Sequence, residues 1–280
     1  MSKMTLLEIF FSVFSFVWGA VWGSFMNVVI HRLPRGMSLV RPPSHCPHCG
    51  TGIKAWHNVP IFGYMIIGGK CAHCRAPVSI RYPLVELVCA AMGLAVWFSV
   101  AYNPLVPDLG TALSLFAFRF FLVMALVAIT FIDLEFMIIP DVISYPFLAF
   151  GLIQNFLFSF QTQVTIIDSL IGAAAGAGAV LALIFGYKLV TGAEGMGLGD
   201  AKLMAVLGAF LGWKSLPFIF LAGSFQGLLY AGALMLAGSI KGSPWKQALP
   251  FGPFLALAGM EWLFFSDTLG AWLWQLFGLG

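Results

Sequence analysis

Residues 112–132 read ALSLFAFRFFLVMALVAITFI, and the chain continues as DLEFMIIPD over residues 133–141. The first stretch carries a single charged residue, Arg119, and has the length that a helix needs to cross about 30 Å of hydrocarbon. The second stretch places Asp133 and Asp141 where that helix would leave the hydrocarbon. Because acids are costly at the edge of a bilayer, this pattern predicts a membrane protein whose acids are functional.

The composition of the whole chain supports the membrane prediction. Of the 280 residues, 60% are hydrophobic and 9% are charged, and the mean hydropathy is +0.96. The apolar runs lack the alternating polar pattern of a membrane barrel, so helices must satisfy the backbone hydrogen bonds. We predict an all-α polytopic membrane protein with about eight transmembrane helices, over residues 9–30, 83–102, 112–132, 138–160, 166–190, 201–213, 216–238 and 252–276, of which the sixth is short.

The basic residues predict the orientation of these helices. If Met1 lies outside, the segments 31–82, 133–137, 191–200 and 239–251 face the cytoplasm. Most of the 14 Lys and Arg then lie on or near the inner side: Arg32, Arg35, Arg41, Lys54, Lys70, Arg75, Arg81, Lys188, Lys202, Lys241 and Lys246. The net charge of +3 therefore reflects topology, and we expect no nucleic-acid partner.

The first apolar run could also be a cleaved signal peptide. We expect it to remain as a span, because residues 9–30 are long for the apolar core of a signal peptide and run directly into a basic loop.

Four cysteines stand in the one long hydrophilic segment, residues 31–82. The sequences HCPHCGTG and GGKCAHCRAP form two C-x-x-C pairs, whose residues are Cys46, Cys49, Cys71 and Cys74. Two such pairs about 21 residues apart are typical of a tetrahedral zinc site. Two disulfides are the alternative, but a basic cytoplasmic loop predicts reduced thiols. Four thiolates leave no open coordination position, so we predict a small cytoplasmic domain with structural zinc, inserted after the first helix.

A second acid stands at the start of the short sixth span. Asp200 ends the sequence EGMGLGD, residues 194–200, and the predicted topology places it at the same membrane edge as Asp133. Two carboxyl groups at matched depth predict aspartyl proteolysis, in which one activates water and its partner polarises the scissile carbonyl. Gly197 and Gly199 would allow positive φ angles and a close approach of the backbone, so that Asp200 points at its partner.

Helix capping is the alternative role for these acids. We favour it for Asp141, Glu135 and Glu194, and Asp200 is also well placed as an N-cap. Capping does not explain Asp133, because the helix dipole opposes an acid at a helix C-terminus.

The chain resembles the type IV prepilin peptidases, bacterial inner-membrane GxGD aspartyl proteases also called leader peptidase/N-methyltransferases. GxGD alone would be a weak motif. Nearly the whole chain carries the resemblance, through the two C-x-x-C pairs and through GSFMNVVIHRLP at 23–34, RYPLVEL at 81–87, IDLEFMIIPD at 132–141, EGMGLGDAK at 194–202 and PFGPFLALAG at 250–259.

The resemblance implies that Asp133 and Asp200 are the catalytic pair, and that the substrate is a prepilin or pseudopilin of a type IV pilus or type II secretion system. Its basic leader would be removed at the cytoplasmic face. The resemblance also implies methylation of the new N-terminus with S-adenosylmethionine, in the first cytoplasmic region around Gly23, Asn27 and Arg32. Because no glycine-rich strand–turn–helix signature is present, the residues that contact the methyl donor are not assigned.

These inferences divide the chain into a first transmembrane helix (1–30), a tetracysteine domain linked with methylation (31–82) and a membrane protease domain (83–280). A proton-coupled transporter is the competing class, but it predicts matching helix breaks in two halves of the chain, and only one such break is present. A non-catalytic zinc-loop adaptor would have no use for the paired acids.

Overall fold

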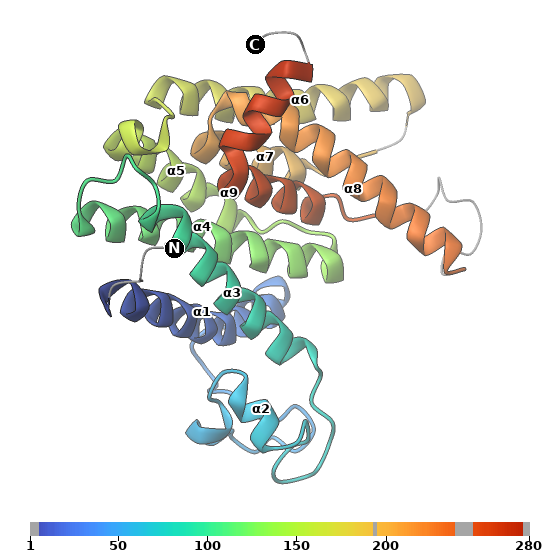
Figure 1. Cartoon of the computed structure of the whole chain (residues 1–280). Coiled ribbons are helices and arrows are strands. Elements are labelled where there is room, and N and C mark those ends of the chain that lie inside the picture. Colours follow the sequence, from blue (N-terminus) through green and yellow to red (C-terminus); the bar gives the residue numbers. More distant parts are fainter. Residues whose placement is uncertain (1–5, 193–194, 239–248, 277–280) are drawn as a thin grey trace. The chain divides into compact units, whose positions relative to one another are not determined.

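The structure, a computed structural model, describes residues 6–192, 195–238 and 249–276. All eight expected spans are helical (Figure 1). They correspond to α1 (Leu6–Arg32), α3 (Arg81–Ala101), α4 (Leu109–Phe136), α5 (Asp141–Thr162), α6 (Ile166–Thr191), α7 (Leu198–Leu211), α8 (Leu216–Leu236) and α9 (Gly252–Leu276).

Six candidate membrane spans in the described part of the chain are long and apolar enough to cross a bilayer: Leu6–Arg35, Arg81–Ala101, Leu109–Phe136, Asp141–Thr162, Ile166–Thr191 and Trp213–Leu236. Helix α7 has only 14 residues and is not among them. The chain is therefore an all-α, multi-pass membrane protein, as the composition predicted.

The chain divides into two compact units, Met1–Met124 and Ala125–Gly280, which we call unit 1 and unit 2. The boundary falls within α4, so this helix begins in unit 1 and ends in unit 2.

In unit 1, α1 and α3 pack against each other at glycines. A Cβ atom on Gly19 would lie 2.4 Å from the carbonyl oxygen of Cys89, and one on Gly23 would lie 2.7 Å from the Cα atom of Glu86. These two glycines form a G-x-x-x-G motif, which lets membrane helices approach closely. The sequence GSFMNVV therefore begins with a packing residue.

Residues 33–80, which we call the tetracysteine segment, connect α1 to α3 along the chain. The segment contains two 3₁₀ turns, η1 (Leu33–Arg35) and η2 (Ala55–His57), and the short helix α2 (Phe62–Ile66). Ile61 precedes α2 with φ 64° and ψ −56°, and the Phe62 N–H donates to the carbonyl of Pro60 at 2.6 Å. This is a γ-turn of the rare, strained kind. The Ile61 N–H donates to the carboxylate of Glu86 on α3 at 2.7 Å, which ties the turn to a membrane helix.

Helix α7 is the buried helix of unit 2. It packs against α5, α6 and α9, and most of its side chains are buried. A Cβ atom on Gly208 would lie 2.2 Å from the carbonyl oxygen of Gly172 on α6, and one on Gly176 would lie 2.6 Å from that of Met204. Small residues thus fix the position of α7 against α6.

The short length of α7 has a structural reason. A helix that ends in a buried position leaves carbonyl groups without partners, which is costly in a membrane protein. Here the Asn155 side chain donates to the carbonyls of Ala209 and Phe210 at 2.9 and 3.0 Å, and the Ser169 hydroxyl donates to Ala209 at 2.8 Å. These side chains from α5 and α6 allow α7 to end inside the protein.

Candidate active site

Asp133 lies in the last turn of α4, in unit 2. The helix ends at Phe136, and Met137 takes the left-handed conformation, with φ 54° and its N–H bonded to the Asp133 carbonyl at 2.9 Å. This end turns the chain toward α5. The Asp133 side chain is only 5% exposed, so its carboxyl group is removed from solvent within this unit.

Asp200 lies in the first turn of α7 and is 7% exposed. Its N–H donates to the carbonyl of Gly197, the N-cap residue, at 3.2 Å. The Asp133 carboxyl group is near enough for the charges of the two acids to interact. Two acids that are 67 residues apart in sequence therefore lie together at neighbouring helix ends.

The expectation of positive φ angles at Gly197 and Gly199 was wrong. Gly197 has φ −83°, and neither glycine is among the residues with positive φ. The expectation of a close approach holds for Gly199, where a Cβ atom would lie 3.0 Å from the Cβ of Ile139. A Cβ atom on Gly197 would make only ordinary contacts, the nearest at 3.8 Å from atoms of Gly199 and Asp200. Close packing, rather than unusual backbone angles, explains the second glycine.

Gly252 belongs to this site, although the sequence analysis did not assign it a role. Its N–H donates to the Oδ2 atom of Asp133 at 3.1 Å, and a Cβ atom here would lie 2.7 Å from that oxygen. The same Cβ would lie 3.0 Å from the side chain of Ile139, so this glycine adjoins both the acid and its apolar neighbour. The glycine between two prolines in PFGPF, at the start of α9, was the signal in the sequence.

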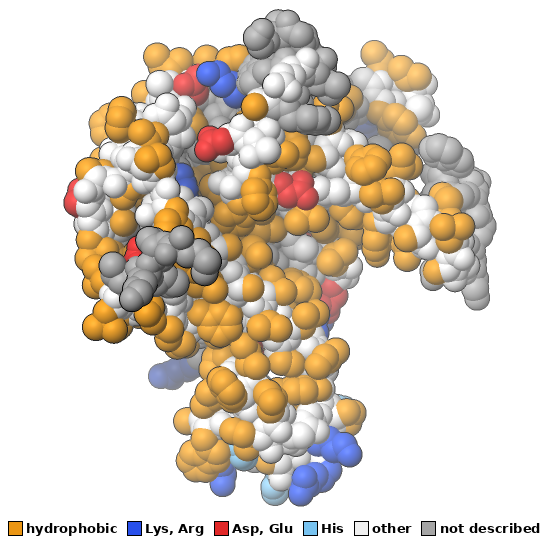
Figure 2. Space-filling model, viewed as in Figure 1, with side chains coloured by type: hydrophobic (Ala, Val, Ile, Leu, Met, Phe, Trp, Pro, Cys, Tyr) orange, Lys and Arg blue, Asp and Glu red, His pale blue; other side chains and the backbone are white. Residues whose placement is uncertain are grey.

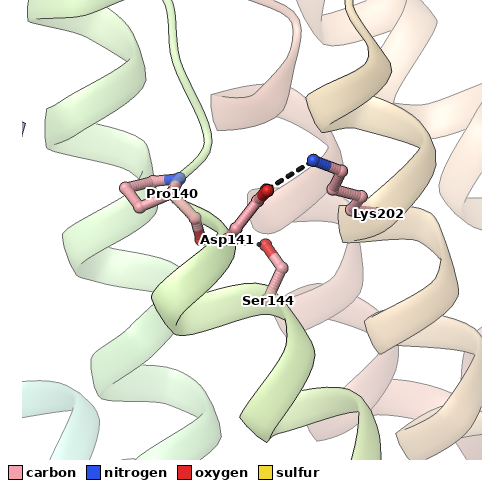
Figure 3. Close-up of polar contacts among 4 residues, drawn as sticks. All are labelled: Pro140, Asp141, Ser144 and Lys202. Carbon is pink, nitrogen blue, oxygen red and sulfur yellow. Dashed lines mark hydrogen bonds and ion pairs between the residues drawn. The ribbon is translucent and has the colours of Figure 1, made fainter.

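Capping was the wrong role for Asp141. The N-cap of α5 is Pro140, and no side chain caps this helix. The carboxylate of Asp141 instead binds the amino group of Lys202 on α7, while the Ser144 hydroxyl donates to the Pro140 carbonyl at 3.2 Å (Figure 3). Likewise, no side chain caps α7, so Asp200 is not an N-cap. The ion pair joins the starts of α5 and α7 beside Asp200.

The other two acids given a capping role remain predictions. Glu135 lies in the last turn of α4, and Glu194 lies outside the described residues.

The four cysteines of the tetracysteine segment meet at one point. Their sulfur atoms all lie within 4.8 Å of one another, and those of Cys46 and Cys74 are 3.8 Å apart. A tetrahedral zinc ion with bonds of about 2.3 Å would hold sulfur atoms roughly 3.8 Å apart. All five cysteines of the chain are free thiols, so the four could hold a metal ion.

The two C-x-x-C turns have the same backbone pattern. The N–H of Cys46 donates to Thr51 and that of Cys71 donates to Ala76, at 2.9 and 2.8 Å. Backbone N–H groups of Cys74 and His73 lower the pKa of the Cys71 thiol to about 6. The Ala76 N–H also favours the thiolate of Cys74, but burial and the other three thiols raise its pKa to about 11. Four packed thiols cannot all ionise without a cation, which fits a metal site.

The residues suspected of binding the methyl donor are buried in unit 1. Gly23 packs on α3, and the Arg32 guanidinium donates to the Ser38 carbonyl at 3.0 Å. The Asn27 amide nitrogen donates to the carbonyls of Gly23 and Tyr82 at 3.3 and 3.0 Å, and its Oδ1 atom is buried without a partner. Gly23 thus packs on α3, Arg32 binds the backbone that follows α1, and Asn27 retains a free acceptor.

Comparisons with known proteins agree with this architecture. Residues 17–100 match the bacterial peptidase A24 N-terminal domain, and residues 120–232 match the type IV leader peptidase family. A prepilin leader peptidase/N-methyltransferase of Aeromonas hydrophila is 39% identical, over 92% of this chain and 91% of its own length. Proteins of the same name from Pseudomonas aeruginosa and Burkholderia pseudomallei are each 37% identical, over 90% of this chain and over 89% and 85% of their own lengths.

No solved structure matches the chain. Because these relatives share more than a third of their residues with it along nine-tenths of its length, the chain belongs to the type IV leader peptidase family, as its motifs predicted.

Proposed function

We propose that this protein removes the leader peptide of type IV prepilins or pseudopilins by aspartyl proteolysis, and that Asp133 and Asp200 perform the reaction. The observation that carries this proposal is the pair of buried, interacting carboxyl groups at neighbouring ends of α4 and α7. The names of the relatives support the substrate class. The basic loops support cleavage at the cytoplasmic face of a bacterial inner membrane.

The chemistry requires one proton shared by the two acids. The ionised carboxylate accepts a proton from a water molecule as the water oxygen attacks the scissile carbonyl carbon. The protonated partner donates to the carbonyl oxygen, which takes up the electron pair of the C=O bond. When the C–N bond breaks, the leaving nitrogen receives a proton from one acid, while a hydroxyl of the tetrahedral intermediate returns its proton to the other acid and re-forms the C=O bond. Gly252 holds one Asp133 oxygen through its N–H, which leaves the other oxygen for water or substrate.

Isosteric substitution tests this assignment. Asp133→Asn and Asp200→Asn keep the shape of the side chains but remove acid–base capacity, so each should abolish leader removal from a prepilin. Mass spectrometry of the substrate would measure the reaction in reconstituted full-length protein. Asp267→Asn, which changes an exposed acid of α9, is the matched control and should cleave normally. Cleavage at the wild-type rate by Asp200→Asn would exclude the aspartyl mechanism.

We also propose that the protein methylates the new N-terminal amine, and that unit 1 carries this activity. S-adenosylmethionine would supply the methyl group. The free Oδ1 of Asn27 fits this role, because a buried acceptor can take a hydrogen bond from an N–H of the amine and orient it. Within this proposal, residues 1–30 form the first membrane helix, 31–82 the tetracysteine domain and 83–280 the protease domain.

Zinc would be held by Cys46, Cys49, Cys71 and Cys74 and would stabilise the tetracysteine segment without entering either reaction.

The two activities should separate by mutation. A pre-cleaved pilin supplied with labelled S-adenosylmethionine should still be methylated by Asp133→Asn and Asp200→Asn, because methyl transfer needs a deprotonated amine in line with the donor and no acid pair. Asn27→Ala and Arg32→Ala should instead weaken methylation and spare cleavage. Loss of both activities in correctly folded Asp133→Asn and Asp200→Asn proteins would refute the separation alone.

A further inference from the structure

The tetracysteine segment carries an exposed apolar surface, which we call the segment patch. Its members are Trp56, Val59, Phe62, Met65 and Ile66, whose side chains are 60%, 44%, 63%, 68% and 67% exposed. Trp56 lies in η2, Val59 lies between the two elements, and Phe62, Met65 and Ile66 lie in α2. Large apolar side chains that gather at a water-exposed surface mark an interaction site.

The exposed charges of the tetracysteine segment are all positive, and the Glu86 carboxylate that binds the Ile61 N–H belongs to a buried residue. Residues 31–82 contain seven Lys and Arg and no Asp or Glu, and the nearest acids along the chain are Glu8 and Glu86. The exposed basic side chains include Arg41, Lys54, Lys70 and Arg75. Figure 2 shows basic and histidine side chains gathered at one end of this part of unit 1, beside apolar ones. The occupant of the patch must therefore be both apolar and anionic.

We propose that the segment patch docks on an anionic phospholipid surface. The segment is tied at both ends to membrane helices, since it starts after Arg32 of α1 and ends before Arg81 of α3. A bilayer surface is thus always within its reach. Lys54 lies over the ring of Trp56, with its nitrogen 5.3 Å from the centroid. Tryptophan and lysine side chains are both typical of the lipid headgroup level, where an apolar body meets a polar or charged tip.

Charge distinguishes lipid from other occupants. A basic peptide would be repelled by the segment, whereas phosphatidylglycerol headgroups would attract its basic residues and the acyl chains would accept Phe62 and Met65. The docking would hold the tetracysteine segment flat at the membrane surface. This proposal does not depend on either enzymatic reaction, so it can fail while the proposed function stands.

Hydrogen exchange in lipid nanodiscs tests the proposal on the full-length protein. Discs of pure phosphatidylcholine would be compared with discs of phosphatidylcholine and phosphatidylglycerol at 3:1. Peptides covering residues 54–66 should exchange more slowly in the anionic discs, and high salt should remove the difference. Lys54→Gln should lower the docked-to-free ratio about fivefold, which is the effect of removing one charge near an anionic surface.

Lipid quenching identifies what covers the patch. Bromine-labelled lipids should quench the fluorescence of Trp56, obtained as the difference between the wild type and Trp56→Phe. The double variant Trp56→Ser/Phe62→Ser should lose the lipid-dependent protection, while Val40→Ser should keep it, because Val40 is 82% exposed but outside the patch.

Two results would overturn docking on lipid. Exchange that is fast and equal in both kinds of disc would mean that the patch remains in water. Slow exchange without lipid dependence and without quenching of Trp56 would mean that protein covers it.

Discussion

Replacing Gly208 by alanine should impair cleavage without touching either aspartate. In α7 the added Cβ would lie 2.2 Å from the carbonyl oxygen of Gly172, and ordinary contact begins near 3.4 Å. The two helices would have to separate by roughly 1 Å, because backbone atoms on both sides leave no flexible side chain to move. Overpacking of this kind costs about 1–3 kcal/mol.

The displacement matters because α7 carries Asp200 about 12 Å along its axis from Gly208. A shift of about 1 Å in a catalytic group can lower a rate about 100-fold. We therefore expect Gly208→Ala to reduce kcat for leader removal by 10- to 100-fold, with a smaller change in KM and a lower melting temperature. Steady-state cleavage of a prepilin, followed by mass, would measure it.

Gly178→Ala is the matched control. Gly178 lies in α6, the helix that packs on Gly208, but an added Cβ there meets nothing within 4 Å. The Gly178→Ala protein should cleave at the wild-type rate, and its stability should be unchanged or slightly higher because alanine has the better helix propensity. If Gly208→Ala cleaved as fast as Gly178→Ala, the close approach of α6 and α7 would not position Asp200, and the reasoning would be refuted.

Three further outcomes are expected. Glu86→Ala should destabilise the turn at Ile61 by about 1–3 kcal/mol, which hydrogen exchange at this turn would measure as faster exchange. Glu86→Gln keeps a hydrogen-bond acceptor and should change little, so equal effects of the two variants would show that the hydrogen bond is not responsible. Freshly purified protein should contain one zinc per chain. Cys46→Ser should lose the metal and loosen the tetracysteine segment, while circular dichroism should show that the helices persist. Less than about half an equivalent of zinc in the wild type, together with no free thiols, would favour disulfides. Lys202→Gln should lower stability by no more than about 1 kcal/mol, because its ion pair with Asp141 is partly exposed, and a larger loss on thermal unfolding would contradict this.

The sequence determined the class of protein and the chemical groups. Long apolar runs fix membrane helices because backbone groups in hydrocarbon must be bonded within their own segment. The paired C-x-x-C turns predicted a four-thiol cluster because each turn is formed by hydrogen bonds within its own short stretch of backbone, such as those of the Cys46 and Cys71 N–H groups. Asp200 could be singled out as well, because an acid is costly at the edge of an apolar run.

How these groups are held depends on contacts between helices that are distant in the chain. Gly199, Gly208 and Gly252 look alike in sequence, yet the first packs on Ile139, the second on α6 and the third binds Asp133. Asp141 followed a proline as a capping residue would, but a lysine 61 positions later took its carboxylate. Local patterns cannot specify such partners, because which backbone or side chain lies opposite depends on how distant helices pack.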